Sequence, residues 1–391
     1  MSLDLQSDAR GVFPSQMLTE AIKQGHIWAE HGDIPTENVQ PASVDLRLGD
    51  VAYRLRCSFL PDNDTVVNKL RRFQMGEVDL TGDGGILEQN RPYLVPLVEN
   101  LRLPTGVRGK ANPKSSTGRL DTFTRVITDN NSLFDEIPSG YDGRLYLEIV
   151  PRTFTIKVRH GLALNQLRLM IGRTELEDEE ILDLHRASPL LFRNGIAIPP
   201  SQIEVNNGLF LGLHLGRQKG GEVVGYRAKE NSNLVDMSKI NHYHHHTFWE
   251  EVFSESGGRI VLDPEKFYLL LSQDSVRIPP EYAAEMTAYD PTSGELRTHY
   301  AGFFDPGFGL DPATGELNGS RAALEVRAHD VPFAVEHGQN ICKLSFERMI
   351  AVPDRLYGRA LESNYQGQQV ALGKHFKRVR EKQLPSAALF Q

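Results

Sequence analysis

Three adjacent hydroxyls, a glycine and two cations lie within six residues of this chain, in the run Lys-Ser-Ser-Thr-Gly-Arg at positions 114–119. Hydroxyl and backbone N–H groups can surround a phosphate, and an arginine can bind it through two parallel hydrogen bonds. The alternative is an ordinary polar loop. The run therefore predicts a site for anionic oxygens, provided that the rest of the chain supplies partners for it.

A single carboxylate, Glu325, interrupts the apolar run Ala-Ala-Leu-Glu-Val at positions 322–326. Burial raises the pKa of a carboxyl group toward neutrality, and such a group can both accept and return a proton. The alternative is a strand carboxylate that faces solvent. Glu325 is therefore a candidate general acid/base.

The elements that must position these residues are short strands. Residues 43–49, 93–98, 144–150 and 154–158 alternate between polar and apolar types, and glycine, proline and asparagine turns separate them. Such alternation is typical of half-buried strands. No succession of strand, helix and parallel strand is present. The sequence predicts a mainly β fold with a few short helices.

The sequence also repeats itself at long range. Several pairs of segments match at nearly constant separation: 46–49 with 213–216, 93–104 with 268–279, 147–148 with 324–325, and 158–161 with 335–338. Self-similarity that keeps its register indicates two copies of one unit. We predict a first domain at residues 1–175, a linker at 176–195 and a second domain at 196–391.

Each predicted copy keeps only part of a site. The counterpart of the run 114–119 in the second copy, around residues 289–294, has lost the arrangement of hydroxyls followed by an arginine. Conversely, Ala-Gly-Phe-Phe-Asp-Pro-Gly at 301–307 has a proline, Pro138, where its aspartate would fall in the first copy. A complete site would therefore need both copies.

The composition narrows the classes of function. The chain has 391 residues and a formal net charge of −8, so nonspecific nucleic-acid binding through bulk positive charge is not expected. Its two cysteines, Cys57 and Cys342, cannot form a disulfide framework. No apolar run has membrane-spanning length, and no signal-peptide core is present at the N-terminus. We expect a cytoplasmic protein that binds neither nucleic acid nor a membrane.

These motifs, in this order, resemble the dCTP deaminases of the trimeric dUTPase-like superfamily. The matching segments are residues 42–49, 115–119, 301–307, 324–325, 335–346, 357–359 and 365–369. The resemblance implies two tandem dUTPase-like domains, each a distorted β-barrel or jelly roll, with the phosphate loop in the first and the carboxylate in the second.

The resemblance also implies roles for individual residues. Glu325 would be the general acid/base, with Ser115 and Arg119 beside the reacting pyrimidine, and Asp305 would hold the deoxyribose. The other implied substrate-binding residues are Lys114, Ser116, Thr117, Gly118, Ala301, Gly302, Ala323, Leu324, Tyr357, Asn364 and Gln368. Among them, Lys114 and Ser116 would bind phosphate, while Tyr357 and Gln368 would cover the nucleotide. Asn364 stands where the family has a lysine that binds the triphosphate.

The implied activity is hydrolysis of dCTP to dUTP and ammonia, in the supply of dUTP and dTTP. Zinc-dependent deaminases use a Cys-x-x-Cys motif that this chain lacks, so a carboxylate mechanism without zinc is expected. Mg²⁺ would bind through the substrate triphosphate. The alternatives are a dUTPase, an enzyme with both activities, and a non-catalytic nucleotide-binding module. Feedback inhibition by dTTP and assembly into a homo-oligomer would be consistent with the resemblance.

Two further features of the sequence, the residue Glu148 and the histidines at 242–246, allow more than one interpretation. Glu148 repeats the position of Glu325, either as a vestigial carboxylate or as part of a degenerate regulatory site. The histidines at 242–246 form either a surface loop or a metal site, and no cysteine or carboxylate lies at ligand spacing from them. We interpret them as a loop, and the basic run 375–380 as a solvated helix end.

Overall fold

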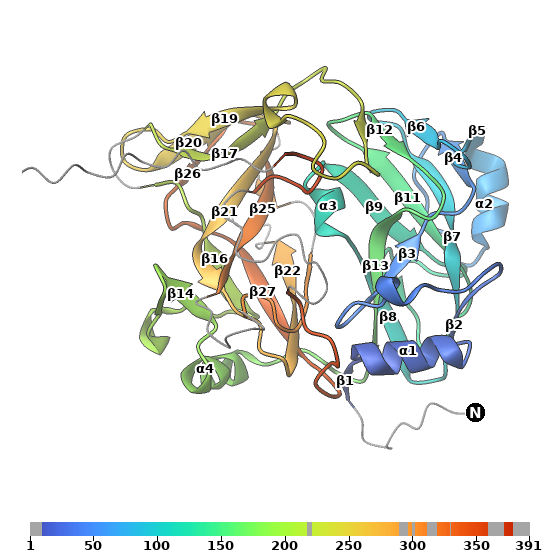
Figure 1. Ribbon diagram of the computed structural model, residues 1–391, viewed down its shortest axis with the longest axis horizontal. Helices are drawn as coiled ribbons and strands as arrows, with labels where there is room; N and C mark the ends of the chain where they lie inside the picture. The colour runs from blue at the N-terminus through green and yellow to red at the C-terminus, as the bar shows by residue number, and fades with distance from the viewer. Residues whose placement is uncertain are drawn as a thin grey trace, which may run out of the picture.

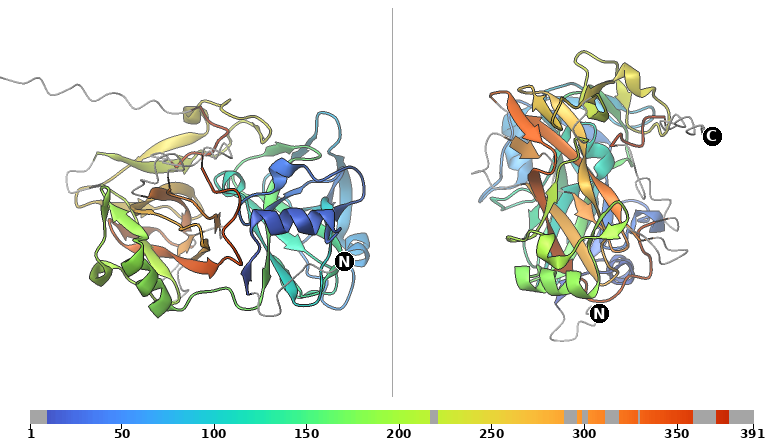
Figure 2. Two further views of the ribbon diagram at one scale, coloured as in Figure 1. Left: turned by 60° about the horizontal axis from the view of Figure 1, so that its bottom comes forward. Right: turned by 90° about the vertical axis from the view of Figure 1, so that its left-hand side faces the viewer.

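The computed structural model of this chain describes residues 10–216, 221–288, 296–298, 302–310, 319–328, 330–358 and 371–377. Two groups of strands lie side by side, the first in blue and green and the second in yellow and orange (Figures 1 and 2). The predicted mainly β fold is confirmed, and strands β3, β7, β11 and β12 coincide with the four alternating stretches.

The N-terminal half carries thirteen strands and three α-helices among its described residues. The strands are β1 (Gly11–Val12), β2 (Ile27–Ala29), β3 (Val44–Arg47), β4 (Val51–Leu55), β5 (Gln74–Asp79), β6 (Gly85–Leu87), β7 (Tyr93–Arg102), β8 (Val107–Pro113), β9 (Thr122–Ile127), β10 (Glu136–Ile137), β11 (Asp142–Pro151), β12 (Ile156–Val158) and β13 (Ala163–Ile171). The helices are α1 (Ser15–Lys23), η1 (Thr36–Asn38), α2 (Val66–Phe73) and α3 (Ser115–Gly118).

The C-terminal half begins with α4 (Asp178–Ala187) and contains two short 3-10 turns, η2 (Pro200–Gln202) and η3 (His245–Thr247). Its described strands are β14 (Leu191–Arg193), β15 (Ile196–Ala197), β16 (Leu209–Gly212), β17 (Val223–Ala228), β18 (Val235–Asp236), β19 (Trp249–Phe253), β20 (Arg259–Leu262), β21 (Phe267–Val276), β22 (Tyr282–Ala288), β23 (Leu296–Thr298), β24 (Phe303–Phe304), β25 (Ser320–Ala328), β26 (Phe333–Glu336) and β27 (Asn340–Arg348).

Each half contains a large antiparallel sheet with a smaller sheet beside it. In the first half, the sheet with strand order β5-β4-β7-β11-β9 packs next to the sheet with order β1-β13-β8-β10, in which β3 also pairs with β13. In the second, β15-β14-β21-β17-β19, with β25 paired to β21, packs next to β16-β27-β22-β24. The inner faces of the strands carry buried leucine, isoleucine and valine, as in sheets that pack face to face.

The two halves share backbone pairing and buried side chains. Strand β18 of the second half pairs in parallel with β12 of the first. Trp249, Phe267 and Phe376 from the second half belong to the core of the first. At the junction, Glu285 on β22 accepts hydrogen bonds from Lys110 (2.5 Å) and Asn112 (2.9 Å) on β8. These contacts fix the relative orientation of β8 and β22, and therefore of the elements that follow them.

None of the helices in the described parts of the chain is long and apolar enough to cross a bilayer.

Candidate active site

The predicted anion loop is held at the end of β8, where Lys114 leads into the single turn α3 (Figure 1). The Lys114 N–H donates to the Leu164 carbonyl (3.0 Å), and the Thr117 hydroxyl donates to the same oxygen (2.8 Å). Ser116, Thr117 and Gly118 are buried, whereas Ser115 is exposed. The loop is therefore a fixed element, with the Thr117 hydroxyl bound to β13 and the Ser115 hydroxyl at the surface.

Glu325 meets this loop across the junction. Alternate residues of β25, including Leu324, point into the second core, so Glu325 and Ala323 face the other side. A Cβ atom placed on Gly118 would lie 2.7 Å from Cδ of Glu325, which shows how closely the carboxyl packs against the loop. Burial raises the pKa of Glu325 well above its ordinary value, the Arg119 guanidinium opposes this shift, and Asp121 adds to it.

Arg119 is buried, with 2% of its surface exposed. Its Nη1 donates to the backbone carbonyls of Ala371 (3.0 Å) and Leu372 (3.4 Å). The chain after the second half therefore returns to the first half and fixes the guanidinium beside Glu325. The sequence predicted that Glu325 and Arg119 would meet, and the geometry agrees.

A cluster of charged side chains surrounds Lys114. Its ammonium forms an ion pair with Oδ2 of Asp45 on β3, while the buried Oδ1 has no hydrogen-bond partner among the described residues. Lys374 is close enough to these groups that Lys114 contributes to lowering its pKa, after burial, while Asp45 opposes the shift. Two ammonium groups and one carboxylate thus lie within electrostatic range of one another. Sequence reasoning did not name Asp45 or Lys374, although Asp45 lies within the matched segment 42–49.

Asp305 follows β24 and is buried beside the fully buried Arg168 of β13. Arg168 Nη2 lies 3.8 Å from Asp305 Oδ1, and the guanidinium carbon lies 3.9 Å from the centre of the Phe303 ring. Nη1 of Arg168 forms an ion pair with Glu347. Burial raises the pKa of Asp305 to about 6, with Arg168 opposing and Asp45 adding to the shift. Arg168 is a second residue that sequence reasoning missed.

Gly302 directly precedes β24, and Tyr357, from the segment after β27, packs against the turn that holds Asp305. The Tyr357 N–H donates to the Pro306 carbonyl (2.9 Å), and its ring centre lies 5.5 Å from that of Phe308. The Gly302 carbonyl accepts a hydrogen bond from Met286 N–H (2.9 Å). The remaining predicted residues, Ala301, Asn364 and Gln368, lie outside the described residues.

The residue of the first half that matches Glu325 is Glu148, and it has no exposed surface. Glu148 is fully buried, and its Oε2 accepts hydrogen bonds from Nε (2.9 Å) and Nη2 (2.6 Å) of Arg125. The Arg125 guanidinium stacks 3.7 Å from the centre of the Phe134 ring. Apolar side chains of α2 and its flanks pack nearby: Phe59, Val66, Leu70 and Phe73. Glu148 is therefore neutralised and covered.

Residues 375–377, the described part of the basic run 375–380, do not form the solvated helix end that the sequence suggested. Among residues 371–377, His375 and Phe376 are buried, and Phe376 packs against Trp249. The segment between β16 and β20, called the insertion below, supplies aromatic side chains that pack against Phe376: Tyr243, Phe248 and Trp249. A local charge pattern cannot reveal this packing. Burial lowers the pKa of His375 to about 4.

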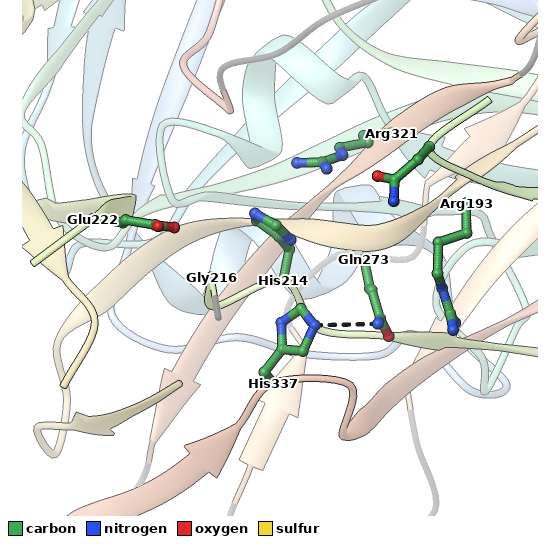
Figure 3. Close-up of a pocket in the computed structure, with 8 residues that line it drawn as sticks. Arg193, His214, Gly216, Glu222, Gln273, Arg321 and His337 are labelled. Carbon is green, nitrogen blue, oxygen red and sulfur yellow. Dashed lines mark hydrogen bonds between the residues drawn. The ribbon is translucent and has the colours of Figure 1, made fainter. Parts of the chain in front are cut away.

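A separate cavity of about 260 Å³ lies in the second half (Figure 3). His214 and His337 project into it side by side, with Gln273 hydrogen-bonded to His337 (3.2 Å). Its Arg193 is already held by Asp274 through two hydrogen bonds, of 2.7 and 2.9 Å. The cavity is lined by none of the predicted site residues.

The chain is similar to known proteins along most of its length. Residues 9–173 match the N-terminal domain of 2'-deoxycytidine 5'-triphosphate deaminase, and residues 177–376 match its C-terminal domain. The crystal structure of 2'-deoxycytidine 5'-triphosphate deaminase from Agrobacterium tumefaciens superposes with a TM-score of 0.80 at 46% identity, covering 87% of this chain and 99% of that one.

Two curated relatives match shorter segments. A "dCTP deaminase, dUMP-forming" from Coprothermobacter proteolyticus is 29% identical over 124 residues, which cover 31% of this chain and 60% of that protein. A dCTP deaminase from Natronomonas pharaonis is 32% identical over 122 residues, which cover 30% of this chain and 57% of that protein. The chain thus spans about 60% of the length of these relatives. With both domain models matched in order along its length, the chain belongs to the 2'-deoxycytidine 5'-triphosphate deaminase family.

Proposed function

We propose that this protein hydrolyses dCTP to dUTP and ammonia, in the supply of dUTP and dTTP in the cytoplasm. The observation that carries the proposal is the position of the Glu325 carboxyl, buried against Gly118 and beside Arg119, with a pKa raised well above its ordinary value by burial. A carboxyl that titrates closer to neutral pH can exchange protons with water and with an amine.

In the proposed reaction, ionised Glu325 takes a proton from water while the water oxygen bonds to C4 of cytosine, and this proton passes to N3. A second proton, from the new C4 hydroxyl, passes through Glu325 to the amine. The C4–N bond then breaks, ammonia leaves, and the oxygen becomes the carbonyl of uracil. The Arg119 guanidinium stabilises negative charge on the attacking oxygen, and Ser115 orients the water.

We assign the triphosphate to the Lys114 side of the loop. Lys114, the Ser116 hydroxyl and Lys374 would supply donors, because two neighbouring ammonium groups attract an anion. Mg²⁺ bound to the phosphate oxygens would neutralise part of their charge. Asp45 Oδ1, buried and without a partner among the described residues, is an oxygen of the kind that Mg²⁺ or its bound water prefers.

The nucleoside would lie between the two halves, with Asp305 on the deoxyribose and Tyr357 over the turn. We further propose that the halves are duplicated domains of one unit, divided as the sequence repeat predicts. In this view Glu148 is vestigial, since Arg125 occupies its carboxylate. Inhibition by dTTP would then be competitive at the one divided site, whatever the assembly state of the chain.

The proposal is tested by replacing Glu325 with glutamine, which keeps the shape of the side chain but cannot exchange a proton. We expect ammonia release from dCTP to fall by about 10³-fold or more, while dCTP binding measured by calorimetry is retained. Glu148→Gln, the same change at the matching position of the first half, should leave turnover unchanged. Full turnover by Glu325→Gln would refute the assignment, and dCTP binding without turnover by the wild-type chain would favour a nucleotide-binding module.

A second candidate function is supported by the relative described as dUMP-forming. An enzyme of that kind would hydrolyse dUTP further to dUMP and diphosphate. Incubation of the pure chain with dCTP, with ammonia and diphosphate measured in the same sample, separates the two. Ammonia alone supports the deaminase, equal amounts support both activities in one chain, and diphosphate alone would support a dUTPase.

A further inference from the structure

Three side chains with metal-binding atoms come together in the insertion between β16 and β20. His245 and His246 lie in η3, and Glu251 lies on β19; one ligand atom from each falls within 4.8 Å of the others. The centres of the two imidazole rings are 3.7 Å apart. The pairing of Glu251 with Tyr226 on β17 brings the carboxylate back to the histidines. The spacing of residues along the sequence did not predict a carboxylate ligand for these histidines, because it is the pairing of β19 with β17 that brings Glu251 close to them.

The surroundings of His245 orient its ring toward a ligand. Its Nε2 is buried and has no hydrogen-bond partner among the described residues. The Tyr226 ring packs edge-on against the imidazole, with ring centres 5.8 Å apart. A buried ring nitrogen without a partner costs free energy unless something binds it. His246 and Glu251 are exposed, so both can rotate toward a common point.

We propose that His245, His246 and Glu251 bind one Zn²⁺ ion, with water as the fourth ligand. Two imidazole nitrogens and one carboxylate oxygen form a donor set that zinc takes in tetrahedral geometry. Ligand distances of about 2.0–2.2 Å place neighbouring ligand atoms about 3.4 Å apart. The exposed side chains would therefore close inward by roughly 1 Å, which surface rotamers accomplish at low cost.

The ion would be structural, because the same insertion holds the segment that fixes Arg119. The neighbouring His244 is hydrogen-bonded to Lys377 (2.9 Å), and the Lys377 N–H donates to the Tyr243 carbonyl (2.8 Å). Lys229 donates to the His246 carbonyl (2.6 Å). Closing η3 onto β19 around zinc would stiffen this attachment of residues 371–377. No ligand of the ion takes part in the reaction proposed above.

The test is a titration of the untagged full chain, freed of metal by a chelator, with ZnSO₄ in an isothermal calorimeter. We expect one equivalent of Zn²⁺ to bind. Glu251→Gln and His246→Ala should each weaken binding by at least about tenfold, which is 1.4 kcal/mol. His242→Ala, an exposed histidine of the same loop outside the cluster, is the matched control. Because no nucleotide is present, the result does not depend on whether the chain deaminates dCTP.

Two results would overturn the proposal. One is the absence of a binding heat and of retained zinc in the wild-type chain, and the other is equal zinc binding by the wild type and Glu251→Gln. The structural role has its own measurement, hydrogen exchange of residues 371–377. Zinc should slow this exchange in the wild type and not in Glu251→Gln, and equal exchange with and without zinc would refute the stiffening of this segment.

Discussion

Replacing Gly118 with alanine is the sharpest test of the divided site, because it alters the contact between the halves without replacing a charged residue. The added Cβ would lie 2.7 Å from both Cδ and Oε1 of Glu325 and closer still to Oε2. Non-bonded heavy atoms prefer separations of about 3.5 Å or more, so the carboxyl would have to move by at least about 0.8 Å. Strand pairing fixes the backbone of Glu325 opposite Leu269, and the side chain must therefore take up the shift.

A displacement of about 1 Å in a catalytic group can cost about 10²-fold in rate, or about 2.7 kcal/mol of the activation barrier. We expect kcat for ammonia release to fall by about 30- to 100-fold in Gly118→Ala. The folded state should lose little stability, because Gly118 has no left-handed backbone conformation and alanine favours helical turns.

The assay is ammonia release at saturating dCTP, with the melting temperature of each variant measured alongside. Gly76→Ala is the matched control, since nothing lies within 4 Å of its added Cβ and its backbone is not left-handed. A Gly118→Ala variant that melts like the wild type and retains kcat within about threefold would refute the claim that the Glu325 carboxyl works in this position.

Three further outcomes follow from buried charges. Because the pKa of Asp305 is raised to about 6, its protonated form stabilises the fold at low pH, and this stability is lost as pH rises from about 4 through 6. In urea unfolding, the stability of Asp305→Asn relative to wild type should therefore increase by up to about 3 kcal/mol between pH 4 and pH 7.5, and a difference that does not depend on pH would contradict this. Lys374→Met should raise KM for dCTP about tenfold with little change in kcat, since it removes an ammonium beside Lys114, and an unchanged KM would exclude Lys374 from the triphosphate site. Arg125→Met leaves the buried Glu148 without its partner and should destabilise the protein by about 3–5 kcal/mol, whereas a loss below about 1 kcal/mol would contradict the stabilising role of this ion pair.

Local patterns predicted the fold class and the buried carboxyl of Glu325, but they did not predict its partner Arg119. Alternation of polar and apolar residues predicted strands because each strand buries one face, and this relation holds without knowledge of the partner strand. The burial of the Glu325 carboxyl could likewise be predicted from its apolar neighbours in the run 322–326. Its meeting with Arg119 followed from the order of motifs, since neither residue's local sequence specifies the other.

The residues that sequence reasoning missed are those whose role depends on a distant partner. Arg168 looks like any strand arginine until β13 packs against Asp305 and Glu347 of the other half. Lys374 likewise gains its neighbours Lys114 and Asp45 only when the last described segment folds back onto the first half. Such pairings are set by the packing of whole sheets, and a residue's own neighbours in the chain carry no trace of them.

The two carbonyls that hold Arg119 come from residues 252 and 253 positions later in the chain. At ribosomal rates of about 5–20 residues per second, that separation corresponds to roughly 13–50 s of synthesis. The first half can bury its own leucines and valines during this interval, but the Arg119 guanidinium cannot bind the carbonyls of Ala371 and Leu372 until those residues have been synthesised. Assembly of the reaction centre is thus a late event in the birth of each molecule, and a chain released early by the ribosome would carry the anion loop without the means to use it.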